Sequence, residues 1–212
     1  EELEAIFTAA NLSYIYYPFI NPGAPLTFQI MDDCNSYAAQ GKAYPNIIFL
    51  ENHGLIVWHD DADECMALYN RVDDLLKQVI YKTQNIVPYP SFADLAKTDN
   101  GFASNNPFLK DMAVQGIASA ENIAKYLLYP DQIVYLNAGI EGENPKIRFE
   151  NGTVLYACSQ TEAQALEEAL LAFVYLLYLA KASNKKLRNM PDSGIAFILG
   201  WDAEKYRKSQ IK

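Results

Sequence analysis

Histidine is the residue type in this sequence that most suggests a chemical role, and His53 has the more informative setting of the two histidines. The chain contains two histidines, and one stands in Asn52-His53-Gly54, between two short runs rich in Ile, Val, Phe and Trp. Such runs predict buried strands, at residues 46–50 and 54–58. The turn between them places the His53 imidazole at the end of the two strands, because Gly54 allows the backbone to reverse sharply. The position suits a metal ligand, and it also suits an ordinary turn histidine.

No other catalytic motif competes with this histidine. The sequence has no Gly-rich phosphate loop and no Gly-x-Ser-x-Gly elbow. A serine or cysteine nucleophile would need a histidine base, and only His53 and His59 are available. His59 begins an acidic helix cap, where we expect it to point to solvent or to pair with Asp60. Because catalytic zinc takes at least three protein ligands, one imidazole cannot hold the metal, and any partners of His53 must lie elsewhere.

The amino-acid composition bears on whether the protein binds nucleic acids or membranes. Half of the 212 residues are hydrophobic and 13% are aromatic, which is ample for a packed core. The net charge of −9 disfavours contact with phosphodiester backbones, so we expect no nucleic-acid partner. The nearest basic patch, Lys185-Lys186-Leu187-Arg188, is interpreted as a solvated helix end. The apolar block at 169–180 is shorter than the ~18–20 residues that a membrane span needs, so we expect no membrane association.

The three cysteines indicate a cytoplasmic location. Cys34, Cys65 and Cys158 are odd in number and show no Cys-x-x-Cys spacing, which predicts neither a zinc knuckle nor a disulfide framework. Two of them, Cys34 and Cys65, fall on apolar faces of predicted helices, where a free cysteine behaves as a small hydrophobic residue. This usage is typical of a reducing compartment.

Residues 1–90 predict an α/β domain with helices on the faces of a largely antiparallel sheet. The predicted elements are a helix at 1–8, a strand at 13–19, a helix from Pro25 to a cap at Gly41, the strands at 46–50 and 54–58, and an amphipathic helix from an Asp61/Glu64 capping box to about Lys82.

Residues 91–212 predict a smaller α+β segment beyond a loop-rich boundary at about residue 90. The predicted elements are a short helix at 92–97, a helix at 120–128, a strand at 132–137, a hairpin around Asn151-Gly152, a long helix from a Thr161/Gln164 capping box to Ala182, and a terminal helical segment at 195–207. The middle of the long helix is apolar nearly all round. It should therefore be buried on several sides or lie in a subunit interface.

The stretch around His53 resembles a known family. Residues 47–58, with the acidic cap and amphipathic helix after them, are similar to the second half of the class II aldolase/adducin domain. The segment at 16–26, with its Asn-Pro-Gly turn, fits the sequence that precedes that motif, so the resemblance covers roughly residues 1–83. The tail at 201–207 is similar to the end of the extended aldolase region in rhamnulose-phosphate-aldolase-like members. The resemblance implies an α/β/α layered, class II aldolase-like fold, truncated at its N-terminal side.

The resemblance also implies a reaction. Family enzymes cleave a ketose 1-phosphate into dihydroxyacetone phosphate and an aldehyde, using a Zn²⁺ ion held by three histidines as a Lewis acid. Two ligands come from an upstream His-x-His, and the third is the histidine of Asn-His-Gly. Only this third ligand carries over, to His53, because the chain contains no His-x-His. The family's phosphate-binding segment and glutamate base are likewise missing, and Glu51 does not take the role of that base.

We therefore expect a fragment of an aldolase-like enzyme. The chain opens at Glu1, without methionine and within a predicted helix, which places the missing ligands and base before it. As given, the chain should be catalytically inactive and should bind zinc weakly or not at all. For the intact parent we expect a small-molecule sugar phosphate as substrate and, by resemblance, a homo-oligomer.

Two alternatives remain open. If the His-x-His is truly absent from the protein, the chain would be a non-catalytic, adducin-like structural or interaction module. Separately, residues 91–212 could form an oligomerisation or regulatory domain, for which the long apolar helix is the supporting feature. A buried core helix is the simpler interpretation of that element.

Overall fold

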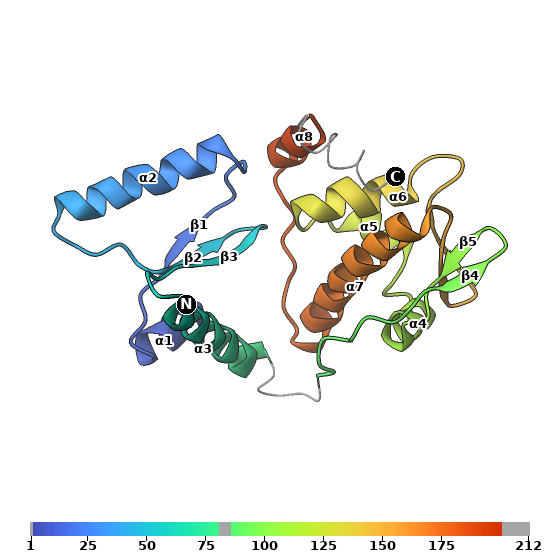
Figure 1. The fold of residues 1–212 in the computed structure, drawn as a ribbon, viewed down its shortest axis with the longest axis horizontal. Helices are drawn as coiled ribbons and strands as arrows, with labels where there is room; N and C mark the ends of the chain where they lie inside the picture. The colour runs from blue at the N-terminus through green and yellow to red at the C-terminus, as the bar shows by residue number, and fades with distance from the viewer. Residues whose placement is uncertain (1, 81–85, 201–212) are drawn as a thin grey trace. The chain divides into compact units, whose positions relative to one another are not determined.

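The chain forms two compact units, each built around its own small sheet. The computed structural model describes residues 2–80 and 86–200, drawn in colour in Figure 1. The first unit is Glu1–Lys82 and the second is Thr83–Lys212, whereas the sequence placed the boundary at about residue 90. The chain is a mixed α/β protein, with a three-stranded sheet in unit 1 and a four-stranded sheet in unit 2.

Unit 1 contains the predicted elements in the predicted order. They are α1 (Glu2–Ala9), β1 (Ile15–Tyr17), α2 (Ala24–Ala39), β2 (Ile47–Leu50), β3 (Gly54–Val57) and α3 (Ala62–Ile80). The strand order is β1-β2-β3, with β1 parallel to β2 and β2 antiparallel to β3. Because Tyr17 pairs with Leu50, the C-terminal ends of β1 and β2 both reach the turn that carries His53.

The core of unit 1 is small and lies under one face of the sheet. Figure 1 shows α1 and α3 together on one side of the strands and α2 on the other. The fully buried side chains on the α1/α3 side are Phe7, Ile47 and Val72. In contrast, α2 buries none of its residues, and its Phe28 and Met31 are 62% and 52% exposed. The helix predicted from its spacing is present, and the residues that define that spacing, Leu26, Ile30, Cys34 and Tyr37, are half-buried.

Asp61 caps the N-terminus of α3, as its position in the capping box predicts. Its Oδ1 accepts hydrogen bonds from the backbone N–H groups of Asp63 (2.9 Å) and Glu64 (3.0 Å). These donors would otherwise lack partners in the first helical turn. We expect Asp61→Ala to destabilise unit 1 by about 1 kcal/mol in urea unfolding, since the cap is lost. Asp60→Ala, one residue earlier, is the matched control and should change stability little; equal losses would contradict the capping role.

Unit 2 packs helices against an antiparallel sheet. Its elements are β4 (Ala96–Thr98), β5 (Gly101–Ala103), α4 (Pro107–Val114), α5 (Ala120–Lys125), η1 (Gln132–Asn137), α6 (Ala138–Ile140), β6 (Ile147–Glu150), β7 (Thr153–Tyr156), α7 (Gln160–Ala182) and α8 (Asp192–Gly200). The strand order is β4-β5-β7-β6, with every pair antiparallel. The hairpin of β6 and β7 is confirmed, and Asn151 (φ 50°) and Gly152 (φ 73°) have the two positive φ angles of a type I′ turn.

The long helix α7 is the central element of the unit 2 core. Its buried residues come from several sides of the helix and include Leu166, Leu170, Phe173 and Leu177. By length and composition α7 is also apolar enough to cross a membrane, and half of that apolar window is buried inside unit 2. Such burial is what a core helix of a packed unit shows.

Three sequence predictions for unit 2 are wrong. Residues 92–97 do not form a helix, because 96–98 instead extend the sheet by pairing with β5. The predicted strand at 132–137 is the π-helical turn η1, since its apolar run is buried without alternation and a short buried run does not distinguish strand from helix. The N-cap of α7 is Ser159 rather than Thr161: its Oγ accepts from the Glu162 N–H at 3.3 Å.

Two predicted helices of unit 2 are present but shorter than expected. The helix expected at 120–128 ends at Lys125, two residues before Leu127 accepts a hydrogen bond from the Met190 N–H. The terminal helix is present as α8, and the part of that prediction beyond residue 200 lies outside the described residues.

Candidate functional site

The turn between β2 and β3 holds the His53 side chain at the surface. The His53 N–H donates to the Leu50 carbonyl at 3.1 Å and closes the turn. Asn52 adopts a positive φ of 57° and Gly54 one of 142°, so the backbone reverses within a few residues. Asparagine and glycine tolerate such angles better than other residues, which explains why they flank the histidine. His53 itself is exposed.

Glu51 joins this turn to the neighbouring strand β1. Its backbone N–H donates to the Tyr17 carbonyl at 3.0 Å, and its Oε2 accepts from the Phe19 N–H at 2.9 Å. The carboxylate therefore fixes the chain that leaves β1 against the turn that carries His53. Glu51 is a positioning residue in this arrangement.

His59 does not join His53. The two residues stand at opposite ends of β3, and the Nδ1 of His59 accepts a hydrogen bond from the Asp61 N–H at 3.1 Å. An accepting ring nitrogen carries no proton and supports the backbone just before α3. His59 is exposed, which agrees with one of the two positions expected for it, and its hydrogen-bond partner is the backbone of Asp61 rather than Asp60.

The described residues do not form a group that could by itself hold a zinc ion. Among residues 2–80 and 86–200, no three His, Cys, Asp or Glu side chains are grouped closely enough to hold a metal ion. A catalytic zinc needs three protein ligands and an open position. His53 is an exposed imidazole on a hydrogen-bonded turn, and an imidazole of this kind could serve as one ligand. The described residues contain no group of three that would complete a site around it.

A tyrosine–aspartate cluster lies on the α2 side of the same sheet. The Tyr17 hydroxyl donates to the Asp33 carboxylate, and it lies 2.6 Å from the Tyr44 hydroxyl. Tyr44 in turn stacks on Trp58, with ring centroids 5.6 Å apart. Burial, reinforced by the hydrogen bond to Asp33, raises the pKa of Tyr17 far above its ordinary value. The hydroxyl therefore stays protonated and attaches α2 to the sheet.

Sequence reasoning missed a buried acid, Glu167 on α7, which is fully buried within the described part of the chain. The residue is fully buried, and its Oε1 accepts from the Ser104 hydroxyl at 2.7 Å while its Oε2 accepts from the Tyr156 hydroxyl at 2.5 Å. Burial raises the pKa of Glu167 above its ordinary value, although both hydrogen bonds act in the opposite direction. Because both carboxyl oxygens are engaged and the side chain has no access to solvent, Glu167 links α7 to the sheet rather than serving a substrate.

Cys158 also lacks the properties of a nucleophile. Burial, with a further contribution from the Glu162 carboxylate, raises the pKa of its thiol from 9.0 to about 11. A reactive cysteine needs a lowered pKa, because the thiolate is the attacking species. Cys34 and Cys65 are partly buried free cysteines, as their positions on helix faces predict.

Comparisons of the sequence with family models, with curated proteins and with solved structures found no match.

Proposed function

We propose that the chain is part of a zinc-dependent class II aldolase-like enzyme in which His53 is one of three histidine ligands. The supporting observation is the exposed His53 on a hydrogen-bonded turn, where the C-terminal ends of two neighbouring strands meet. The motif, its flanking strands and the capped helix after them occur in the order that the family resemblance implies. The finer, class II aldolase-like arrangement of unit 1 belongs to the same proposal.

The reaction in this proposal forms or cleaves a C–C bond in a ketose 1-phosphate, with dihydroxyacetone phosphate and an aldehyde as the other participants. The bound zinc would supply Lewis-acid chemistry at the ketose oxygens. In this proposal Glu51 positions the histidine. Its carboxylate accepts a hydrogen bond from the Phe19 N–H after β1, and this contact holds the turn that carries His53. A cytoplasmic location and a homo-oligomeric state are parts of the proposal.

The coding sequence upstream of Glu1 gives the first test. An in-frame His-x-His preceded by a glutamate would support an enzyme with a complete ligand set. A start codon at residue 1 would overturn the proposal and leave the non-catalytic interaction module. The exposed apolar residues Phe28 and Met31 on α2 favour that second candidate, because solvent-facing apolar side chains on one helix are a common feature of protein contacts.

Substitution of the two histidines gives the second test. In the full gene product, His53→Ala should lower aldol cleavage of ketose 1-phosphates by at least about a hundredfold. Mutating a residue that only hydrogen-bonds to a metal ligand can already cost up to about a hundredfold, and loss of the ligand itself should cost no less. His59→Ala is the matched control, because its imidazole supports a helix entrance, and it should retain activity. Unchanged activity in His53→Ala would remove His53 from the site.

Zinc binding by the 212-residue chain alone tests whether the ligands that accompany His53 lie outside this chain. The chain should bind zinc weakly or not at all in a titration followed by metal analysis, because His53 belongs to no group of three possible ligands among the described residues. Tight, stoichiometric zinc would show that the ligand assignment is wrong.

A further inference from the structure

The described part of unit 2 begins with an irregular segment that is fastened to the long helix α7. Residues 86–91 form neither helix nor strand, and Figure 1 shows the chain passing the C-terminal half of α7 before it reaches β4. Residues 87–90, with the sequence Val-Pro-Tyr-Pro, are called the strap below. The strap differs from an ordinary connecting loop, because two side chains of α7 bind its backbone.

Two tyrosine hydroxyls bind both main-chain groups of one strap residue. The Val87 N–H donates to the Tyr178 hydroxyl at 3.0 Å, and the Tyr175 hydroxyl donates to the Val87 carbonyl at 2.9 Å. Val87 itself is 49% exposed, and its side chain takes no part in these bonds. The two hydroxyls therefore recognise a stretch of main chain rather than a particular side chain.

A ring of the strap packs against the same tyrosines. The Tyr89 ring meets Tyr175 edge to face, with ring centroids 5.1 Å apart. Tyr175 also contacts the rings of Phe108 and Tyr178, at centroid distances of 5.9 and 6.0 Å. These three residues, Phe108, Tyr175 and Tyr178, are called the aromatic surface below. Tyr89 remains 54% exposed, so the strap covers the aromatic surface without being covered itself.

The two prolines suit the strap to this position. Val87 and Tyr89 each precede a proline, which restricts their backbones to extended conformations. Pro88 and Pro90 have no N–H, so the strap has few donors that need a partner. Extended, proline-containing segments that lie on aromatic side chains are a recurrent mode of peptide recognition, because such segments are already extended before they bind.

The strap lies outside the packed core of unit 2. The Asn106 amide anchors the chain just after the strap by donating to the Ser91 carbonyl at 3.1 Å, whereas Val87, Pro88 and Tyr89 are all exposed. A segment with exposed side chains opens at a lower free-energy cost than the core elements do. Such an opening uncovers part of the aromatic surface.

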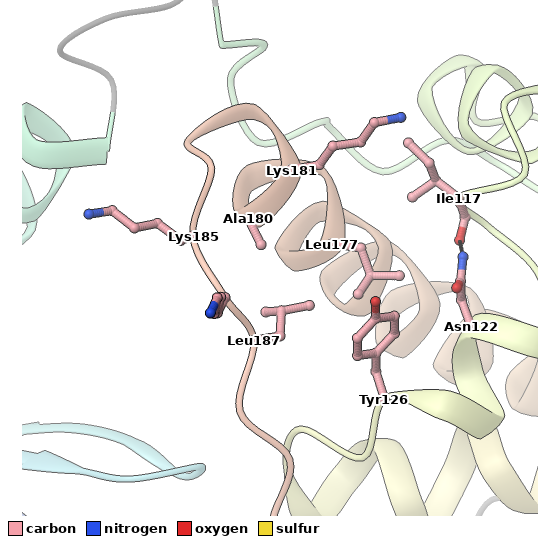
Figure 2. Close-up of a pocket in the computed structure, with 9 residues that line it drawn as sticks. Ile117, Asn122, Tyr126, Leu177, Ala180, Lys181, Lys185 and Leu187 are labelled. Carbon is pink, nitrogen blue, oxygen red and sulfur yellow. Dashed lines mark hydrogen bonds between the residues drawn. The ribbon is translucent and has the colours of Figure 1, made fainter.

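The pocket at the C-terminal end of α7 is a separate feature. It has a volume of about 490 Å³, and no described residue that lines it belongs to the strap or to the aromatic surface. Figure 2 shows the side chains of Lys181 and Lys185 at this pocket pointing away from each other. The contacts of the strap are thus independent of the pocket.

We propose that the aromatic surface is a peptide-binding site that the strap occupies in the absence of a partner. The ligand is an extended, proline-containing segment of another protein, with an aromatic residue at the place of Tyr89. Such a segment can make the same two main-chain hydrogen bonds and the same ring contact, since none of them depends on the Val87 side chain. The strap is a built-in competitor, because its attachment to unit 2 gives it a high effective concentration. The proposal concerns unit 2 and is independent of the function assigned to His53.

A free peptide with the sequence of the strap tests the proposal. The probe is a fluorescently labelled peptide of residues 86–92, and its binding to the 212-residue chain is followed by fluorescence anisotropy. The peptide should bind the Tyr89→Ala chain at least about tenfold more tightly than the unaltered chain, because loss of the ring contact weakens the competing strap. A peptide with alanine in place of its tyrosine is the control and should bind at least about tenfold more weakly.

Removal of the two hydroxyls tests the site itself. In the Tyr89→Ala chain, the double variant Tyr175→Phe/Tyr178→Phe keeps both rings and should weaken peptide binding by about tenfold, since two hydrogen bonds are lost. Tyr69→Phe/Tyr126→Phe is the matched control, because it removes two hydroxyls outside the site, and it should bind the peptide as strongly as the Tyr89→Ala chain does.

Amide exchange measures displacement of the strap directly. Saturating peptide should speed the solvent exchange of the Val87 N–H in the unaltered chain, since the displaced strap gives up its bond to Tyr178. Four results would overturn the proposal: no binding to the Tyr89→Ala chain, equal binding of the alanine peptide, the same loss in both double variants, or unchanged exchange of the Val87 N–H at saturation. A concentration-dependent dimer that the free peptide dissociates would overturn the assignment to a partner protein and show that the strap of a second copy fills the site.

Discussion

Phe7→Ala is expected to destabilise unit 1 by about 3–5 kcal/mol, the usual cost of truncating a buried phenylalanine. The Phe7 ring is fully buried and makes edge-to-face contacts with Tyr14 and Phe49, at centroid distances of 5.0 and 5.5 Å. Few other side chains could compensate, because Ile47 and Val72 are the other buried members of this core. A unit of this size has a total stability of roughly 4–12 kcal/mol, so the loss approaches the whole.

Hydrogen exchange resolved to residues 2–80 and urea unfolding would measure this effect. Phe28→Ala is the matched control: it makes the same truncation on α2, at a side chain that is 62% exposed, and should change stability by no more than about 0.5 kcal/mol. If Phe7→Ala leaves no folded unit 1, Phe7→Leu should give a smaller, measurable loss. Equal effects at the two phenylalanines would show that the assigned core is wrong.

Glu167→Ala should destabilise unit 2 by about 3 kcal/mol, because it leaves the buried hydroxyls of Ser104 and Tyr156 without their acceptor. Glu168→Ala, the next residue on α7, is the control, since its side chain is exposed. Far-UV circular dichroism during urea unfolding would compare the two. A loss as large in Glu168→Ala would show that helix content, rather than the buried contacts, determines the result.

Glu167 also predicts how stability depends on pH. Its pKa is raised in the folded state above the ordinary 4.5, so the folded state holds a proton that the unfolded state releases. Its contribution is therefore complete below pH 4.5 and is lost as the pH rises through the folded-state pKa, by at most about 1.4 kcal/mol per pH unit. Glu167→Gln keeps the shape and removes the titration, so its unfolding free energy should lack this fall. An unaltered pH profile in Glu167→Gln would assign the dependence to other groups.

Local sequence signals predicted most of unit 1 because each element there carries its own marker. The positive φ angles at Asn52 and Gly54, the Asp61 cap and the period of α3 are all properties of a few neighbouring residues. The position of His53 on an exposed turn followed from them. The coupling between Glu51 and Phe19 did not, because it joins residues 32 apart in the sequence.

Unit 2 shows where such signals fail. Residues 132–137 form a π-helical turn because the buried Gln132 side chain binds main-chain groups, accepting from the Leu128 N–H at 2.8 Å and donating to the Tyr126 carbonyl. The Glu167 cluster likewise joins α7 to Tyr156 and Ser104, which lie 11 and 63 residues earlier in the sequence.

The absence of buried residues on α2 has a consequence for local unfolding. This 16-residue helix is held by a half-buried face (Leu26, Ile30, Cys34 and Tyr37) and by attachments such as the Tyr17–Asp33 hydrogen bond, and isolated helices of that length are marginal in water. Its amide protons should therefore exchange through openings that leave α1 and α3 intact. The segment that leads into α2 begins after Phe19, whose backbone N–H is bound by the Glu51 carboxylate. We therefore expect openings of α2 to weaken this hydrogen bond, which lies beside the His53 turn. A binding partner that covers Phe28 and Met31 would suppress these openings and make the turn more rigid from the opposite side of the sheet.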